Sequence, residues 1–221
     1  MSWILYFIVP MIIGFVAQHR VKSTFARNLK VPVANGMTGA DVARHVLDAN
    51  GLHDVTVEET PGSLSDHYDP RNRSVHLSTE VFQGRSVAST AVGAHEVGHA
   101  IQHAQSYGFF RFRSALFPAV AFTSNIWMLF LLGGIFLGVF QLIYVAIALY
   151  SVAVLFQLVT LPVEFDASRR AKRQLKDLGL VPANESDGVA SVLTAAAWTY
   201  VAGALAAVAV LLYYLQFLGN R

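Results

Sequence analysis

The sequence predicts a mostly α-helical integral membrane protein with about four transmembrane helices and a small α+β domain that contains a short antiparallel sheet. Two observations lead to this fold class. Of the 221 residues, 54% are hydrophobic and only 14% are charged, whereas soluble domains contain about 25% charged residues. Residues 115–163 contain no charged side chain, while residues 19–114 have an ordinary globular composition. We therefore expect lipid around part of the chain and a folded polar domain outside the lipid.

The composition also limits the chemistry of the chain. The sequence contains no cysteine, so disulfides and thiolate metal ligands are excluded, and any metal ion must bind His, Asp, Glu or water. The formal net charge of +2 is too small to indicate binding to nucleic acid. We therefore expect the lipid bilayer, and no nucleic acid, among the partners.

The first and last apolar segments are each predicted to form one span. Residues 1–18 form the first span, short for the usual ~20 residues. Its basic residues follow the apolar run, and no small-residue cleavage site is present, so we expect a retained span and not a cleaved signal peptide. Residues 191–219 form the last span.

The long uncharged run must contain two spans. As a single helix, residues 115–163 would extend roughly 70 Å, about twice the ~30 Å hydrocarbon core of a bilayer. The run therefore divides into spans at residues 115–138 and 139–163, joined by a tight turn. The turn is expected near three glycines, Gly133, Gly134 and Gly138.

Basic residues predict how the four spans are oriented. They follow the first span, precede the second and follow the third, whereas the turn between the second and third carries no charge. Four spans place all these basic segments on one side, which the positive-inside rule assigns to the cytoplasm, with both termini outside. The basic residues are Arg20, Lys22, Arg27, Lys30, Arg111, Arg113, Arg169, Arg170, Lys172, Arg173 and Lys176.

The first polar segment, residues 19–114, is expected to be the cytoplasmic domain. In its first helix Val42, Val46 and Leu47 share one face and Gly51 ends the helix. The hairpin is predicted because a stretch rich in turn formers separates its two strands. The predicted elements are helices at residues 37–50 and 86–105, a strand at residues 55–57, and a hairpin of residues 64–68 and 74–77.

The second polar segment, residues 164–190, follows the third span on the same side. Its first half is predicted to continue as a basic helix to about Leu178. Gly179 is expected to end this helix, with Pro182 beyond it.

The predicted helix at residues 86–105 contains the pattern His-Glu-x-x-His, at His95, Glu96 and His99. Histidines four residues apart lie on one face of a helix, about one turn apart, so both imidazoles can bind one ion. Glu96 can then act as general base toward a metal-bound water and pass the proton to the leaving amine. The pattern predicts one catalytic Zn²⁺. The alternative is a surface helix with two solvated histidines.

Catalytic zinc requires a third protein ligand. His103 lies two helical turns from His95, roughly 12 Å in rise, which is too far for one ion to bind all three histidines. Glu164 is the better candidate, because a carboxylate at the end of a long uncharged run is costly unless it is paired or binds metal. The predicted topology also places Glu164 on the same side as His95. Asp166 is the alternative ligand, and a solvated Glu164 at the membrane interface is the alternative role.

Four sequence motifs lie at residues 66–71, 91–103, 161–168 and 195–202. Together they resemble the YugP-type neutral zinc metallopeptidases of bacterial membranes, and the resemblance covers essentially the whole chain. It implies a zincin-like cytoplasmic domain of the gluzincin type, with His95, His99 and Glu164 as zinc ligands and Glu96 as base. It also implies location in the bacterial inner membrane.

The chain departs from the related membrane proteases at one position. Those relatives often carry an aspartate four residues after the ligand glutamate, where it orients a histidine ligand. Ser168 occupies that position here. Either Asp166 or another carboxylate takes this role, or the orienting group differs.

The substrate is expected to be a protein or peptide that adds a strand to a sheet edge, as peptides do in such enzymes. The predicted hairpin supplies that edge, with His67, Tyr68 and Asp69 as candidate substrate-binding residues; the alternative is a hairpin that only packs the domain. The sequence does not choose an oxyanion-stabilising residue among His67, Tyr68, Tyr107 and Tyr200.

The predicted function is hydrolysis of peptide bonds in membrane or membrane-proximal proteins by a zinc endopeptidase. The alternative is a catalytically silent zinc-binding scaffold or chaperone-like protein, against which the intact Glu96 argues. A channel or transporter is disfavoured, because its spans should hold charged residues at mid-depth and these do not.

Overall fold

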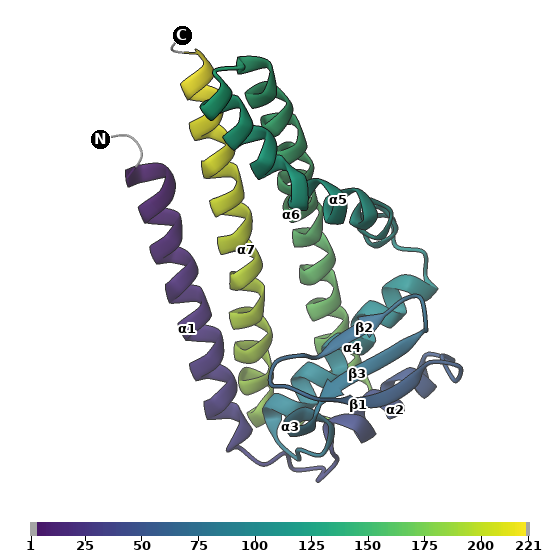
Figure 1. The fold of residues 1–221 in the computed structure, drawn as a ribbon. Coiled ribbons are helices and arrows are strands. Elements are labelled where there is room, and N and C mark those ends of the chain that lie inside the picture. The colour runs from purple at the N-terminus through teal and green to yellow at the C-terminus, as the bar shows by residue number, and fades with distance from the viewer. Residues whose placement is uncertain (1–3, 220–221) are drawn as a thin grey trace. The chain divides into compact units, whose positions relative to one another are not determined.

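The computed structural model describes residues 4–219, and the chain divides into two compact units (Figure 1). Four long helices, α1, α5, α6 and α7, supply unit 1, and three of them contribute residues to both units. Unit 1 comprises Met1–Ala17, Gly108–Pro162 and Thr199–Arg221, and unit 2 comprises Gln18–Tyr107 and Val163–Trp198.

The four long helices each have the length and hydropathy to cross a membrane, which confirms the predicted apolar helices. A short π-helix, Ile4–Ile8, precedes the first of them. Residues 1–3 of the first predicted span lie outside the described residues. The helices are α1 (Val9–Leu29), α5 (Gly108–Leu137), α6 (Phe140–Asp177) and α7 (Ala183–Gly219).

The turn between α5 and α6 confirms the predicted division of the uncharged run. Gly138 lies in this turn with a φ of 69°, a backbone conformation that glycine adopts without strain. Gly134 lies inside α5, where an added Cβ would approach Cγ1 of Ile143 to 2.6 Å, so the two helices pack closely beside the turn. Ile143 belongs to an apolar cluster with Leu131 and Ile147. The hairpin of α5 and α6 is therefore closed by packing as well as by the turn.

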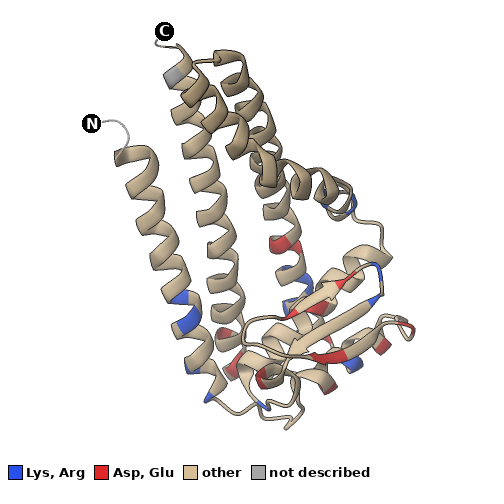
Figure 2. Ribbon diagram, viewed as in Figure 1, with Lys and Arg blue, Asp and Glu red and all other residues tan. Residues whose placement is uncertain are grey.

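Charged side chains gather in unit 2, as Figure 2 shows by colour. By sequence, Arg111, Arg113 and Arg221 are the charged residues of unit 1. The apolar surfaces of the long helices are also widely exposed; Phe136, for example, is 81% exposed. Exposed apolar side chains on uncharged helices are expected where lipid is the surrounding solvent.

Helix α2 (Gly39–Ala49) in unit 2 confirms the prediction for residues 37–50. Thr38 caps its N-terminus: the Thr38 hydroxyl accepts from the Asp41 amide, and the Asp41 carboxylate accepts from the Thr38 amide. The hydrogen bonds from the Thr38 amide and hydroxyl lower the pKa of Asp41. Gly51 follows the helix with a φ of 71° and allows the chain to turn.

The three-stranded sheet consists of β1 (Thr56–Thr60), β2 (His67–Asp69) and β3 (Ser74–Ser78), in the order β1-β3-β2. Strands β2 and β3 form the predicted antiparallel hairpin. The expected short antiparallel sheet is therefore only part of the observed sheet, because β1 pairs with β3 in parallel. The chain passes from β1 at one edge to β2 at the other edge before it returns along β3 in the centre. Strand β3 therefore has one parallel neighbour, β1, and one antiparallel neighbour, β2.

Helix α4 (Val87–Ala104) is the central helix of unit 2 and confirms the prediction for residues 86–105. Ser86 caps it by accepting a hydrogen bond from the Ser89 amide. A Cβ added to Gly93 would lie 2.6 Å from the carbonyl oxygen of Gly39, so α2 and α4 pack with their backbones in contact. A four-residue helix, α3 (Thr79–Phe82), joins β3 to α4. These contacts bury most of α4, including the part that carries the predicted metal ligands.

Candidate metal centre

His95 and His99 lie one turn apart on α4, as the helical period predicts. Their imidazole rings meet edge to face, with centroids 4.9 Å apart. His99 is buried, whereas His95 is partly accessible. Glu96, between them, is only 7% exposed. The helix thus presents two imidazoles and a carboxylate from one largely buried turn.

Glu164 on α6 brings a carboxylate to both histidines. Its Oε2 lies 3.3 Å from Nε2 of His95 and 3.6 Å from Nε2 of His99. Glu164 is 2% exposed, and a buried carboxylate is costly unless a partner balances its charge. Ligand atoms of the three residues all lie within 4.8 Å of one another. Two imidazole nitrogens and one carboxylate oxygen form a donor set suited to zinc.

A close approach of helix backbones places Glu164 beside the histidines. Gly98 lies one residue before His99, and a Cβ there would approach the carbonyl oxygen of Ala167 to 2.6 Å and its Cα to 3.2 Å. Because glycine has no side chain, α4 can lie directly against α6 at this point. The glycine within the His-Glu-x-x-His pattern therefore sets the distance between the two helices that carry the three groups.

Each histidine also has a hydrogen-bonding partner on its Nδ1. The Oε1 of Gln102 lies 3.0 Å from Nδ1 of His99, and the Ser168 hydroxyl lies 3.3 Å from Nδ1 of His95. Both partners leave the two Nε2 atoms directed to Glu164. Partners of this kind orient the imidazoles that bind metals in proteins. Ser168 contacts His95 from the position where the related membrane proteases often carry an aspartate.

Asp166, the alternative ligand, points elsewhere. Its Oδ2 accepts hydrogen bonds from Nε2 of Gln102, at 2.9 Å, and from Nε of Arg170. Arg169 lies 3.7 Å from its other oxygen. Among the residues that the structure describes, the cluster able to hold a metal comprises His95, His99 and Glu164 and leaves Asp166 out.

Sequence reasoning missed Gln102. It is completely buried, and it links His99 on α4 to the carbonyl of Val163 and the carboxylate of Asp166 on α6. Its position three residues after His99 places it on the same face of the helix as that histidine, which was a usable signal.

The candidate substrate-binding residues have three different environments. Tyr68 is buried, and its hydroxyl lies 2.9 Å from Nδ1 of His103 on α4. His67 is exposed and stacks on His76, with ring centroids 4.6 Å apart. Asp69 accepts hydrogen bonds from the Arg71 amide and the Asn72 side chain within the turn. Asp69 therefore shapes the hairpin, while Tyr68 attaches it to α4.

Burial shifts the titration of three residues near these elements. Burial raises the pKa of Tyr68. Burial also lowers the pKa of His103, and the positive charge of Arg73 lowers it further. Burial likewise raises the pKa of Tyr107, whose ring lies 5.8 Å below the guanidinium of Arg170. Tyr68 and Tyr107 thus keep their protons at neutral pH. Tyr200, a further oxyanion candidate, belongs to unit 1.

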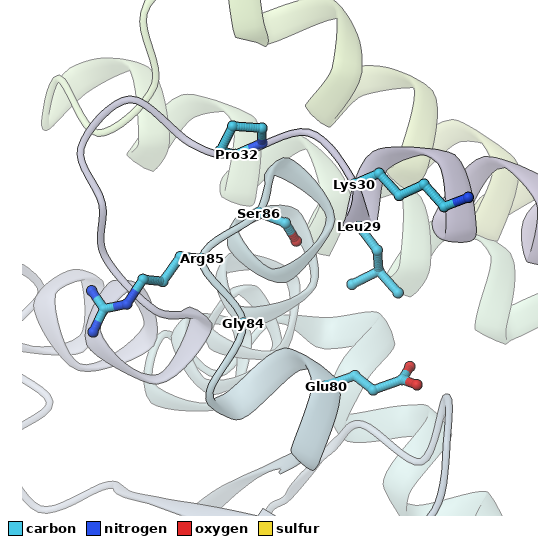
Figure 3. A pocket seen from close by; sticks show the side chains of 7 residues that line it. All are labelled: Leu29, Lys30, Pro32, Glu80, Gly84, Arg85 and Ser86. Atoms are coloured by element: carbon cyan, nitrogen blue, oxygen red, sulfur yellow. The ribbon is translucent and has the colours of Figure 1, made fainter.

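A separate hollow of about 560 Å³ lies at the N-terminal end of α4 (Figure 3). Ser86, at its wall, precedes His95 by nine residues, roughly 13 Å along the helix. The side chains of Lys30 and Arg85 extend from it in opposite directions. None of its lining residues was predicted as a site residue; they are Leu29, Lys30, Pro32, Glu80, Gly84, Arg85 and Ser86.

Comparison with known proteins bears on the whole chain. A sequence model of the family described as "Putative neutral zinc metallopeptidase" matches residues 3–219. The chain is also 49% identical over 222 residues to the "Putative membrane protease YugP" of Bacillus subtilis (strain 168), across 100% of this chain and 99% of that protein. No solved structure matches the chain. The resemblance inferred from the motifs is therefore confirmed, and the chain belongs to this family of neutral zinc metallopeptidases.

Proposed function

We propose that the chain is a membrane-bound zinc endopeptidase that hydrolyses peptide bonds of membrane or membrane-proximal proteins. One zinc ion is held by His95, His99 and Glu164, and Glu96 is the general base. The observation that carries this proposal is the convergence of three donors from two helices on one buried point, with Oε2 of Glu164 3.3 Å and 3.6 Å from the two Nε2 atoms.

The proposed reaction divides the work between the metal and the chain. Bound zinc supplies a Lewis acid that polarises the scissile carbonyl and acidifies water. The carboxylate of Glu96 accepts a proton from the attacking water and delivers it to the nitrogen of the leaving amine. The burial of Glu96 favours this role, because a carboxylate screened from bulk water exchanges protons with the reactants in preference to solvent.

Strand β2 is the proposed platform for the substrate. Within residues 4–219, β2 pairs with β3 along one edge, and no strand pairs with its other edge. An extended peptide can add to such an edge through main-chain hydrogen bonds. The Tyr68–His103 hydrogen bond fixes β2 to the helix that carries the proposed ligands. A peptide on this edge would therefore be held at a fixed register relative to α4.

The proposed topology places the site on the cytoplasmic side of the bacterial inner membrane, with both termini outside. One observation and one general rule support it. The basic residues that follow the first and third predicted spans belong to unit 2, which also contains His95, His99 and Glu164. Basic segments are retained on the cytoplasmic side of membranes. The same topology brings membrane-proximal segments of other proteins within reach as substrates.

The competing function is a zinc-binding scaffold without turnover. Such a protein would need the ligands His95, His99 and Glu164 but would have no use for the carboxylate of Glu96. The presence of Glu96 in the sequence therefore favours the enzyme.

Cleavage of an unstructured protein such as casein by the full chain, purified in detergent, tests the proposal. Glu96→Gln keeps the size of the side chain but removes the base, and should lower the rate by about 100-fold or more while zinc content is unchanged. Glu80→Gln, at an exposed glutamate of the same unit, is the matched control and should cleave normally. Equal cleavage by wild type and Glu96→Gln would assign the activity to a contaminant and favour the scaffold.

A further inference from the structure

The buried side chain of Gln102 can hold only one orientation. Its Nε2 lies 2.8 Å from the carbonyl oxygen of Val163 and 2.9 Å from Oδ2 of Asp166. A carbonyl oxygen and a carboxylate only accept hydrogen bonds, so the two hydrogens of the amide nitrogen must face them. The reverse orientation would place the amide oxygen against two other acceptors. The contacts on α6 therefore decide which end of Gln102 faces α4.

This orientation determines the hydrogen on His99. With the amide nitrogen committed to Val163 and Asp166, Oε1 of Gln102 faces Nδ1 of His99 at 3.0 Å. An amide oxygen cannot donate, so Nδ1 must carry the hydrogen and donate it. In the neutral imidazole, the lone pair is then on Nε2, the atom that lies 3.6 Å from Glu164. The metal-binding atom of His99 is thus left free of a proton.

Arg170 keeps Asp166 in the ionised form, which only accepts hydrogen bonds. Arg170 donates to Oδ2 of Asp166 from Nε and to Oε1 of Gln105 from Nη1, so the guanidinium is held at both ends. A neighbouring guanidinium favours the ionised carboxylate, which has no hydrogen to donate to Gln102. Because Gln102 is fully buried, water does not compete for these hydrogen bonds. The chain of contacts runs from Arg170 through Asp166 and Gln102 to His99.

We propose that Gln102 is a positioning residue that holds His99 in the Nδ1–H tautomer, with Asp166 and the Val163 carbonyl fixing its amide. The inference rests on the proposed function only in taking His99 as a metal ligand. His95 is different: its partner is the Ser168 hydroxyl, at 3.3 Å, and a hydroxyl can donate or accept. Of the two histidines, His99 is therefore the one whose tautomer is set by the protein.

Nitrogen NMR of the zinc-free full chain in detergent, labelled with ¹⁵N-histidine, tests the tautomer without any variant. At a pH where the imidazole is neutral, His99 should show a protonated Nδ1 and an unprotonated Nε2. His99→Gln removes the signals and so assigns them. A protonated Nε2 and bare Nδ1 on neutral His99 would overturn the proposal, whether or not the chain cleaves peptides.

Zinc affinity, measured by competition with a chelator, tests the consequence. Gln102→Leu removes both ends of the amide and should weaken zinc binding by about 10- to 100-fold, the usual cost of losing such a partner. Ser168→Ala should weaken it less. Gln174→Leu, at a glutamine of α6 that bonds to Asn50, is the matched control and should leave zinc affinity unchanged. A Gln102→Leu chain with a lower melting temperature but wild-type zinc affinity would show a merely structural role and refute the proposal.

Two further substitutions test the same hydrogen bonds if the Gln102→Leu chain does not fold. Gln102→Glu still accepts from His99 but sets a second carboxylate against Asp166, so zinc affinity should fall. Adding Asp166→Asn replaces that repulsion with an amide that donates to Glu, and affinity should recover most of the loss. Failure of the double variant to exceed Gln102→Glu would contradict the proposed direction of the hydrogen bonds.

Discussion

The phenol oxygen of Tyr68 lies 2.9 Å from Nδ1 of His103, and this hydrogen bond joins the edge strand β2 to the helix that carries His95 and His99. The rings of Tyr68 and His103 are also in contact, with centroids 5.9 Å apart. His103, which is too far along α4 to share an ion with His95, thus has a structural partner of its own. The proposed substrate platform is therefore attached to α4, the helix that carries the two histidine ligands.

Tyr68→Phe should weaken this connection. Loss of the hydroxyl removes a part-buried hydrogen bond, and the free energy of unfolding should fall by about 1 kcal/mol. Zinc content should be unchanged, while KM for a peptide should rise because β2 is less firmly held. Denaturant unfolding and steady-state kinetics measure the two effects. Tyr144→Phe, at an exposed tyrosine of α6, is the control; equal stability of the Tyr68 and Tyr144 variants would contradict the argument.

Acidification should weaken the fold through His103. Burial, with a contribution from Arg73, holds the pKa of His103 below its ordinary value of 6.5. The folded chain therefore binds this proton less readily than the unfolded chain. Stability that depends on the neutral imidazole is complete above about pH 6.5 and is lost as the pH falls through the lower folded-state pKa. The melting temperature of the zinc-free chain should decrease between pH 7.5 and pH 5.5, and the decrease should be larger in wild type than in His103→Gln. Equal decreases in the two proteins would show that His103 does not cause the loss of stability.

Gly98→Ala should disturb both the fold and the metal centre. The new methyl would lie 2.6 Å from the carbonyl oxygen of Ala167, so α4 and α6 must move apart, at a cost of about 1–3 kcal/mol. Because α6 carries Glu164, zinc affinity should fall together with stability. Gly14→Ala is the matched control, since a Cβ at that helical glycine meets no atom within 4 Å. Comparable zinc affinity in the two variants would show that the close approach is not required for binding.

The proposed topology can be tested with single cysteines, because the chain has none of its own. Lys30→Cys and Lys172→Cys should be protected from a membrane-impermeant maleimide in intact cells and react after lysis. Val139→Cys, in the turn between α5 and α6, should react in intact cells, because the proposed topology places this turn outside. Labelling of residues 30 and 172 in intact cells would reverse the orientation.

The parts of the fold that follow from local sequence could be predicted. Thr38 and Ser86 cap α2 and α4 through their hydroxyls, and Gly51 and Gly138 turn the chain through positive φ angles, all within a few residues. The parallel pairing of β1 with β3 could not be predicted, because which strands become neighbours is decided by long-range contacts and not by the residues of either strand.

The candidate site, too, could be predicted from the sequence only in part. The helical period brings His95 and His99 together, and the cost of a carboxylate at the end of an uncharged run pointed to Glu164. The roles of Gln102 and Ser168 depend on how two helices face each other, with partners more than sixty residues apart in the sequence. No periodicity within one helix contains that information.

Zinc content of the purified chain, measured per polypeptide, is the decisive test of the proposed metal centre. One zinc is expected in wild type and in Glu96→Gln, with cleavage in wild type alone. Glu164→Ala should lose zinc, because only two ligands then remain, whereas Asp166→Ala should retain the metal with weaker affinity. Full zinc content and activity in Glu164→Ala would rule out Glu164 and place the third ligand elsewhere.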